Sequence, residues 1–338
     1  MTSLYVDRRG VELRVDGGAL AFYENGERCG TVPIAALDRV YLRGDVTLQS
    51  SLLGKLGAHG VGVIVMSGRK GEASLMMAQP HNDAARRIAQ YRLSQDAKFC
   101  LTFAQCIVEL KLREQADFLL ELRDKDLQAR YELTSRGRQI SDAVGRVDKQ
   151  ASIAALRGLE GHAAAAYFAG LAAHMPDKLG FEGRNRRPPR DPFNVVLSLG
   201  YTMLHGDTVL ALYGAGLDPF IGFYHGLDFG RESLACDVME PLRPRLDRFA
   251  VHLFKSGALR AEDFSTTAQG CLMGKAGRAR FYPLYEAAAE EFRKRLADSI
   301  GDLIEALKLH GLVDQPQRRS AGNDVADVDE EMDMDAVE

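Results

Sequence analysis

The chain has 338 residues, 46% of them hydrophobic, and a net charge of −4, which allows two domains with sizeable cores. No run of about 18 apolar residues predicts a transmembrane helix, the N-terminus lacks the apolar segment of a secretory signal, and the five cysteines form no CxxC pair. These features exclude a zinc ribbon or a disulfide scaffold, and we expect a cytoplasmic protein with no membrane anchor.

Residues 1–78 predict a small β-rich domain. Short apolar or alternating runs such as "VELRV" and "ALAFYE" are separated by turn residues such as "DGG" and "ENG". One short helix is expected in "QSSLLGKLGAHG" and a buried strand in "VGVIVM". A strand-rich domain with a single helix seldom builds a deep active site, so we expect it to act as a scaffold.

A linker at residues 79–84 leads to a predicted helical domain at 85–318. Apolar residues then recur at helical spacing for about 40 residues, which indicates one long helix or two. Helices are also expected at 155–175 and 193–216, on either side of a basic loop with two consecutive prolines, and in two segments before residue 312. The predicted fold class is α+β, with a small β-rich domain followed by a larger all-α domain.

Residues 319–338 form an acidic tail. From Ser320 onward the chain carries eight acids and no Lys or Arg, so the net charge of the remaining body is +4. Like charge and a lack of large apolar groups predict disorder. The tail either solubilises the protein or competes with nucleic acid for the basic body.

One histidine and two acids lie close together in "GFYHGLDFGRESLACDVMEPLRP". A helix beginning near Ser233, with that residue as N-cap, would project Asp237 and Glu240 from one face. Pro241 removes a helical hydrogen bond, so we expect a kink or restart just after Glu240. His225 lies in a glycine-flanked loop that can bring the imidazole back toward the acids.

Two carboxylates on one face repel each other unless a cation lies between them, and imidazole with carboxylate oxygens suits Mg²⁺ or Mn²⁺. Glu160 is the best candidate for a third ligand, because it lies among small residues that would let another helix approach. Each residue alone also has a structural interpretation. Glu160 could be an exposed glutamate at a helix start, His225 a structural histidine, and Asp237 and Glu240 part of a solvated face.

Clustered basic residues indicate the substrate class. Arginine forks match phosphate oxygens, so arginines beside a carboxylate site favour phosphodiester chemistry. A loop stiffened by prolines would lose little entropy on clamping a DNA backbone, although it could also be an ordinary solvated loop. The candidates for DNA contact are Arg184, Arg186, Arg187, Arg190, Arg243, Arg245, Arg248 and Lys255.

Four segments occur in the order "LEGHAAAAYF", "NRRPPRDPFNVVLSLGYTML", "GLDPFIGFYHG" and "SLACDVMEPLRP". Together they closely resemble the CRISPR-associated spacer-acquisition integrase, the universal nuclease-like protein of CRISPR adaptation. The resemblance extends from the β-rich start to about residue 312. It implies a β-sandwich-like N-terminal domain and an all-α catalytic domain that holds one divalent metal ion, Mg²⁺ or Mn²⁺.

The resemblance also implies roles for individual residues. The family's metal ligands fall on Glu160, His225 and Glu240, the last of which is often aspartate in relatives. Asp237 matches the other acidic position of that helix and would hold a ligand in place or order the nucleophile. Asn194 and Tyr201 match positions of the family's central helix and would line the site.

Reaction and partners follow from the same resemblance. Family members form homodimers through their N-terminal domains, and two dimers flank a dimer of a small ferredoxin-like companion protein in a heterohexamer-type complex. The complex inserts short fragments of double-stranded DNA into a CRISPR array by attack of a 3′-hydroxyl on a repeat-edge phosphodiester. The alternatives are a stand-alone metal-dependent nuclease for branched DNA in repair and a non-catalytic DNA-binding scaffold.

Overall fold

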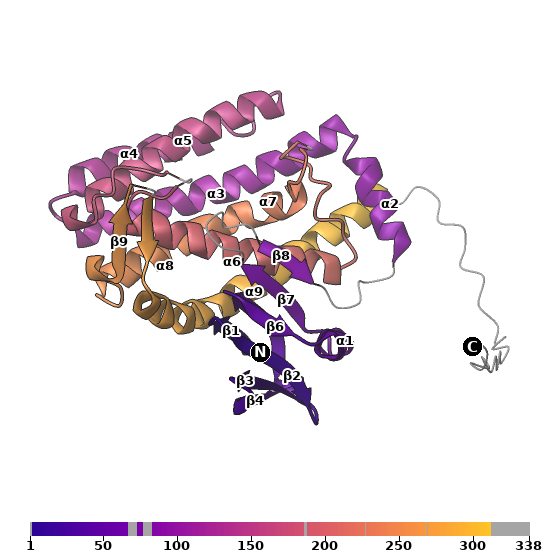
Figure 1. The fold of residues 1–338 in the computed structure, drawn as a ribbon. Coiled ribbons are helices and arrows are strands. Elements are labelled where there is room, and N and C mark those ends of the chain that lie inside the picture. Colours follow the sequence, from indigo (N-terminus) through magenta and orange to yellow (C-terminus); the bar gives the residue numbers. More distant parts are fainter. Residues whose placement is uncertain are drawn as a thin grey trace, which may run out of the picture.

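The computed structural model describes residues 2–66, 73–76, 83–185, 188–226, 228–268 and 270–311. Strands make up the N-terminal part and helices dominate the remainder, which confirms the predicted α+β class (Figure 1). Several predictions lie outside the described residues. They concern linker residues 79–82, the helical domain from 312 to 318, the tail at 319–338, and Arg186 and Arg187.

Two four-stranded sheets form the N-terminal part, in the strand orders β1-β5-β7-β8 and β4-β3-β2-β6. The strand β4 was not predicted, because nearly all of its residues are exposed and its sequence, "ERCGTVP", lacks apolar alternation. The elements are β1 (Thr2–Asp7), β2 (Val11–Asp16), β3 (Ala19–Glu24), β4 (Glu27–Pro33), β5 (Leu37–Arg43), β6 (Val46–Leu48), α1 (Ser50–Ala58), β7 (Gly62–Met66) and β8 (Ala73–Met76).

Alternate residues of β5 serve two different cores, as the two-residue period of a strand requires. Val40 and Leu42 are buried in the core between the two sheets, together with Leu13 of the other sheet. Tyr41 is buried instead in the core that the first sheet shares with the helices. The first sheet is therefore the middle layer between the second sheet and the helical part.

Helices build most of the C-terminal part. The predicted stretch of one helix or two is α2 and α3, which are separated at Asp96, whose side chain caps α3 by accepting from the backbone of Phe99 at 3.1 Å. Two short strands near residues 264–273 pair as a hairpin, although the sequence had predicted only helices in this part of the chain. The elements are α2 (Ala84–Leu93), α3 (Ala97–Lys125), α4 (Arg130–Val144), α5 (Ile153–His174), α6 (Pro192–Gly214), α7 (Ser233–Met239), α8 (Arg243–Lys255), β9 (Phe264–Thr267), β10 (Gly270–Met273) and α9 (Lys275–Gly311).

The central helix α6 packs on the first sheet through glycines. An added Cβ on Gly206 would lie 3.2 Å from Ile64, and one on Gly62 would lie 2.7 Å from Leu210. Glycine at both positions therefore allows the helix and the sheet to approach each other closely. Among the described helices, α6 alone is long and apolar enough to cross a membrane, and 61% of its most apolar window is buried. That burial is typical of a core helix.

A buried aspartate ties the sheet to the helices. Asp207 of α6 is fully buried and accepts a hydrogen bond from the Tyr41 hydroxyl. Its two carboxylate oxygens each lie 3.0 Å from a guanidinium nitrogen, one from Arg39 of β5 and one from Arg293 of α9. These contacts fix the orientation of the sheet against α6 and α9.

Candidate functional site

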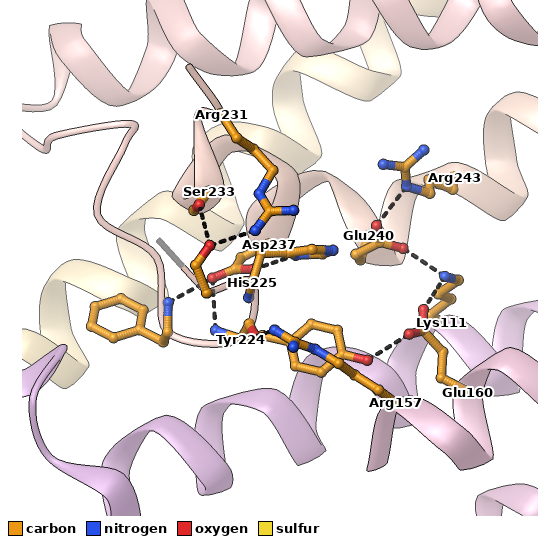
Figure 2. A network of polar contacts seen from close by, with 12 residues as sticks. Lys111, Arg157, Glu160, Tyr224, His225, Arg231, Ser233, Asp237, Glu240 and Arg243 are labelled. Carbon is orange, nitrogen blue, oxygen red and sulfur yellow. Dashed lines mark hydrogen bonds and ion pairs between the residues drawn. The ribbon is translucent and has the colours of Figure 1, made fainter. Parts of the chain in front are cut away.

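Two glutamates from distant parts of the chain share one cation. The Lys111 ammonium, on α3, donates to Oε1 of Glu160 on α5 and lies 2.6 Å from Oε2 of Glu240. Figure 2 shows the lysine between the two carboxylates. The expected cation between two carboxylates is thus present as an ammonium group, and the pair is Glu160 with Glu240 rather than Asp237 with Glu240.

Lys111 is a buried charge, with 7% of its surface exposed. It lies on the apolar stripe of α3, between Val108 and Leu112, which are both fully buried. Burial alone would lower the pKa of Lys111, but the charges of Glu240 and Glu160 outweigh burial and raise the pKa above its ordinary value. The lysine therefore stays protonated and balances the two carboxylates.

Glu240 sits where one helix ends and the next begins. It opens a short 3₁₀ helix, η3 (Glu240–Leu242), between α7 and α8, which confirms the predicted restart at Pro241. Its Oε1 accepts from Nε of Arg243 at 2.8 Å. Burial acts to raise the pKa of Glu240, but Arg243 and Lys111 lower it to about 2, so the group is ionised at neutral pH.

Glu160 is held from the opposite side by a tyrosine. The Tyr224 hydroxyl donates to Oε2 of Glu160 at 2.5 Å. Arg157, one turn before Glu160 on α5, bonds to the Tyr224 carbonyl, and its guanidinium lies 5.4 Å from the centre of the tyrosine ring. Both oxygens of Glu160 therefore have a donor in this structure.

His225 is oriented by Asp237. Asp237 is fully buried, and its Oδ1 lies 2.7 Å from Nδ1 of His225 and accepts from the His225 backbone N–H at 2.8 Å. A proton on Nδ1 leaves Nε2 with a free lone pair. The ring points toward Glu240 in Figure 2, and the His225 imidazole contributes to lowering the pKa of Glu240. Asp237 thus fixes the orientation of the His225 imidazole, while the ligand role of His225 and the expected roles of Asp237 stay predictions.

The loop that carries His225 depends on Gly222. A Cβ there would lie 2.7 Å from Oδ2 of Asp237 and 2.8 Å from the Ser233 carbonyl carbon, so no larger residue fits without a shift. The predicted N-cap at Ser233 is wrong. The N-cap residue of α7 is Glu232, and Ser233 is the first residue of the helix. The Ser233 hydroxyl does not cap the helix but donates to the Gly226 carbonyl at 3.0 Å.

Tyr201 reaches the site through Arg243. The Arg243 guanidinium lies 4.9 Å from the centre of the Tyr201 ring, and the Tyr201 hydroxyl donates to Asp247. Asn194 is fully buried, donates to the Gly183 carbonyl at 2.8 Å and has no recorded contact with the three predicted ligands in the described part of the chain. Asn194 therefore holds the base of the basic loop, and a direct catalytic role stays a prediction.

Four of the six predicted DNA-binding side chains that the structure describes bond to other groups of the protein. Arg184 bonds to Asn194 at 2.7 Å, while Arg245 and Arg248 pair with acids of α3. In the described ranges, Arg190 and Lys255 are the two candidates that are exposed without a recorded side-chain partner. Among the described residues, the other arginines of the expected DNA path thus bond to carboxylates or polar groups of the protein, and their contact with DNA stays a prediction.

The donors at this site match a divalent ion in kind. Within the described residues, no group of three or more His, Cys, Asp or Glu side chains lies close enough to hold a metal. Two carboxylates nevertheless share a position where the protein already keeps a cation, Lys111, and the His225 ring points toward one of them, Glu240. Carboxylate oxygens with one imidazole suit Mg²⁺ or Mn²⁺, so the residues fit such an ion.

Two residues of the site were missed by sequence reasoning. Lys111 had a detectable signal, because a lysine interrupts the apolar stripe of α3. Tyr224 is adjacent to His225 in the chain, but nothing in the spacing indicates that its hydroxyl bonds to Glu160.

The comparisons with known proteins identify the family of this chain. Residues 4–287 match the family described as CRISPR associated protein Cas1. A CRISPR-associated endonuclease Cas1 of Thermodesulfovibrio yellowstonii is 38% identical over 296 residues, covering 87% of this chain and 93% of the relative. A solved Cas1 protein from Thermotoga maritima shares the fold, with a TM-score of 0.78, 22% identity, and coverage of 90% of this chain and 97% of that one.

A second solved structure bears on assembly. The chain matches part of a structure named Cas6-RT-Cas1–Cas2 complex with a TM-score of 0.79 and 25% identity, covering 91% of this chain and 35% of that chain. Since the family match spans most of the sequence and the first relative is similar over nearly its whole length, this chain belongs to the CRISPR-associated Cas1 family.

Proposed function

We propose that this chain is a divalent-metal-dependent DNA endonuclease and integrase that inserts short foreign DNA fragments into a CRISPR array. The observation that carries the proposal is the pair of Glu160, which is partly buried, and Glu240, which is buried, because they share one cation, Lys111. Buried charges are costly, and such clusters are frequent at functional sites. The name of the first relative, CRISPR-associated endonuclease Cas1, supports the same activity.

The proposed reaction is a transesterification. The 3′-hydroxyl oxygen of the incoming fragment bonds to the phosphorus of a phosphodiester at a repeat edge, and the bond from that phosphorus to its own 3′ oxygen breaks. The attacking hydroxyl loses a proton and the departing 3′ oxygen gains one. When water attacks instead, the same site is an endonuclease.

The chain's own residues hold the reacting groups. Glu160, His225 and Glu240 would bind a Mg²⁺ or Mn²⁺ ion, which when bound supplies positive charge against the phosphate and lowers the pKa of the attacking hydroxyl. Asp237 keeps the His225 ring in place, and Tyr224 keeps Glu160 in place.

DNA contact is proposed at the exposed cations. Arg190 and Lys255 face solvent and would contact phosphates, as would Arg186 and Arg187 of the same loop. Such contacts carry little base information, so the choice of repeat would come from DNA shape and partner proteins. The paired side chains of Arg245 and Arg248 would need to exchange a carboxylate for a phosphate to take part.

The proposed assembly follows the family. We expect a cytoplasmic protein composed of a dimerisation domain at 1–78 and a catalytic domain at 85–318. The solved complex that contains Cas1 and Cas2 supports a small ferredoxin-like companion of the Cas2 kind. Double-stranded DNA is the proposed substrate both as fragment and as array.

An integration assay tests this function. The full chain and its companion are mixed with a labelled fragment and a supercoiled plasmid that carries a repeat, in Mn²⁺. Fragments with a 3′-hydroxyl should join the plasmid, whereas fragments with a 3′-deoxy end should not. Cutting without joining would favour the branched-DNA nuclease, and neither cutting nor joining would favour the scaffold.

A further inference from the structure

Lys111 occupies the position between the two predicted acidic ligands. Its side chain is 9% exposed, that of Glu160 is 17% exposed and that of Glu240 is 5% exposed, so this bridge is largely shielded from water. An unpaired carboxylate in such a place would be strongly destabilising. The lysine is therefore the group whose charge both carboxylates share here.

All four carboxylate oxygens of Glu160 and Glu240 have a donor. Lys111 contacts one oxygen of each, Tyr224 bonds to the other oxygen of Glu160, and Arg243 bonds to the other oxygen of Glu240. An ion that binds both glutamates would therefore either share an oxygen with one of these donors or displace that donor.

Lys111 is the donor that can leave most easily. Tyr224 is held by Arg157, and Arg243 lies over the Tyr201 ring, so each is fixed by a further contact. Lys111 has no recorded hydrogen bond other than those to the two glutamates in the described part of the chain. A lysine side chain also has four flexible methylene groups, which allow its ammonium to swing away.

We propose that Lys111 is a positioning residue that pairs Glu160 with Glu240 in the metal-free protein and leaves their oxygens when a divalent ion binds. Two cations within a few ångströms repel each other strongly in a buried site, so lysine and ion do not share these oxygens. Lys111 thus preforms the site and weakens the affinity for the ion. This inference rests on the metal site of the proposed function.

The test is calorimetric titration of the full chain with MnCl₂, with no DNA present. Lys111→Met, which keeps an unbranched side chain only one atom shorter and removes the charge, should bind Mn²⁺ about tenfold more tightly, equivalent to about 1.4 kcal/mol. The metal-free variant should melt at a lower temperature than wild type, and Mn²⁺ should raise its melting temperature more. Lys111→Gln, which retains one donor group without charge, provides a milder version with shifts in the same direction.

The matched control is Lys125→Met. Lys125 lies on the same helix, where it forms an exposed pair with Glu121 at 2.7 Å, so its removal should change neither Mn²⁺ affinity nor melting temperature. A lysine with only a structural role would give weaker Mn²⁺ binding in Lys111→Met, because the ligands would lose their places. Equal or weaker binding in that variant overturns the inference.

The variant Glu160→Gln distinguishes a failure of the proposed metal site from a failure of the proposed role of Lys111. If wild type binds Mn²⁺ and Glu160→Gln does not, the metal site stands and only the lysine variants decide the inference. If wild type does not bind Mn²⁺ at all, the proposed metal site and the inference both fail.

Discussion

Nδ1 of His225 lies 2.7 Å from Oδ1 of Asp237, and the same carboxylate accepts hydrogen bonds from three backbone N–H groups in the loop before α7. One buried side chain therefore sets both the direction of the imidazole and the path of the loop. A carboxylate behind a histidine ligand is a common way of fixing the free ring nitrogen.

Replacing Asp237 by Asn should disturb both functions. The amide has only one acceptor oxygen, so buried N–H groups lose a partner, and we expect a loss of about 1–3 kcal/mol in the free energy of unfolding. Mn²⁺ affinity should fall about 10–100-fold. Chemical denaturation and calorimetry measure the two effects. Asp228→Asn, in an exposed pair with Arg231, is the control and should be neutral.

Gly222 and Gly226 offer a matched pair in one loop. Gly222→Ala places a methyl group against Asp237 and the Ser233 backbone, and overpacking of this kind costs about 1–3 kcal/mol. At Gly226 the nearest atom to an added Cβ is 3.9 Å away, on Arg157, so Gly226→Ala should fold as wild type does. Thermal unfolding with a strand-transfer assay compares them, and equal behaviour of the two variants would contradict the packing described here.

Asp207→Ala tests the junction between the sheet and the helices. Removing this buried carboxylate leaves Arg39 and Arg293 without their shared partner, which should cost about 3–5 kcal/mol. Asp16→Ala breaks an exposed pair with Arg28 and should change stability little. Urea denaturation would measure both, and a loss below about 1 kcal/mol for Asp207→Ala would show that the junction is held mainly by apolar packing.

Stability should depend on pH through Asp247. Burial raises its pKa to about 6 from an ordinary value of 3.8, although hydrogen bonds from Tyr201 and Tyr167 act to lower it. A carboxyl group with a raised pKa in the folded state contributes stability that is complete below about pH 4 and is lost as the pH rises through 6. The free energy of unfolding of Asp247→Asn, taken relative to that of wild type, should therefore rise by roughly 2–3 kcal/mol between pH 4 and pH 7.

Urea denaturation at several pH values measures this difference. Asp142→Asn, at an exposed position of α4, should show the same pH dependence as wild type. If Asp247→Asn and wild type differ in their free energy of unfolding by the same amount at every pH, then Asp247 has the same pKa in the folded and the unfolded protein.

The fold could be predicted where apolar residues follow a period. Runs such as "VELRV" alternate, and the long helices carry clear apolar stripes. The helix α4 lacked such a signal, because Gly137 forms part of its buried face, where an added Cβ would lie only 3.0 Å from Leu120. The short β9–β10 hairpin contains too few residues to show the apolar periodicity of either a helix or a strand.

The site was predictable in its residue types but not in its pairings. Glu160, His225 and Glu240 were predicted as ligands from chemistry and the order of motifs. The structure brings Glu160 and Glu240 to one lysine, and the ligand roles stay a prediction. Lys111 precedes Glu160 by 49 residues and Glu240 by 129, so only the folded chain shows that it lies between them. From the sequence, Arg248 was likewise expected to be a free cation, but in the structure it pairs with Glu121 of α3.

Strand transfer by Glu240→Gln tests the central claim most directly. The variant keeps the shape of the side chain but loses the charge that a divalent ion would need, whereas Glu290→Gln changes an exposed glutamate of α9. The assay measures joining of a labelled fragment to a repeat-bearing plasmid in Mn²⁺, alongside DNA binding by the same preparations. We predict that Glu240→Gln loses joining and keeps DNA binding, while Glu290→Gln keeps both. Joining at the wild-type rate by Glu240→Gln would contradict the assignment of this site.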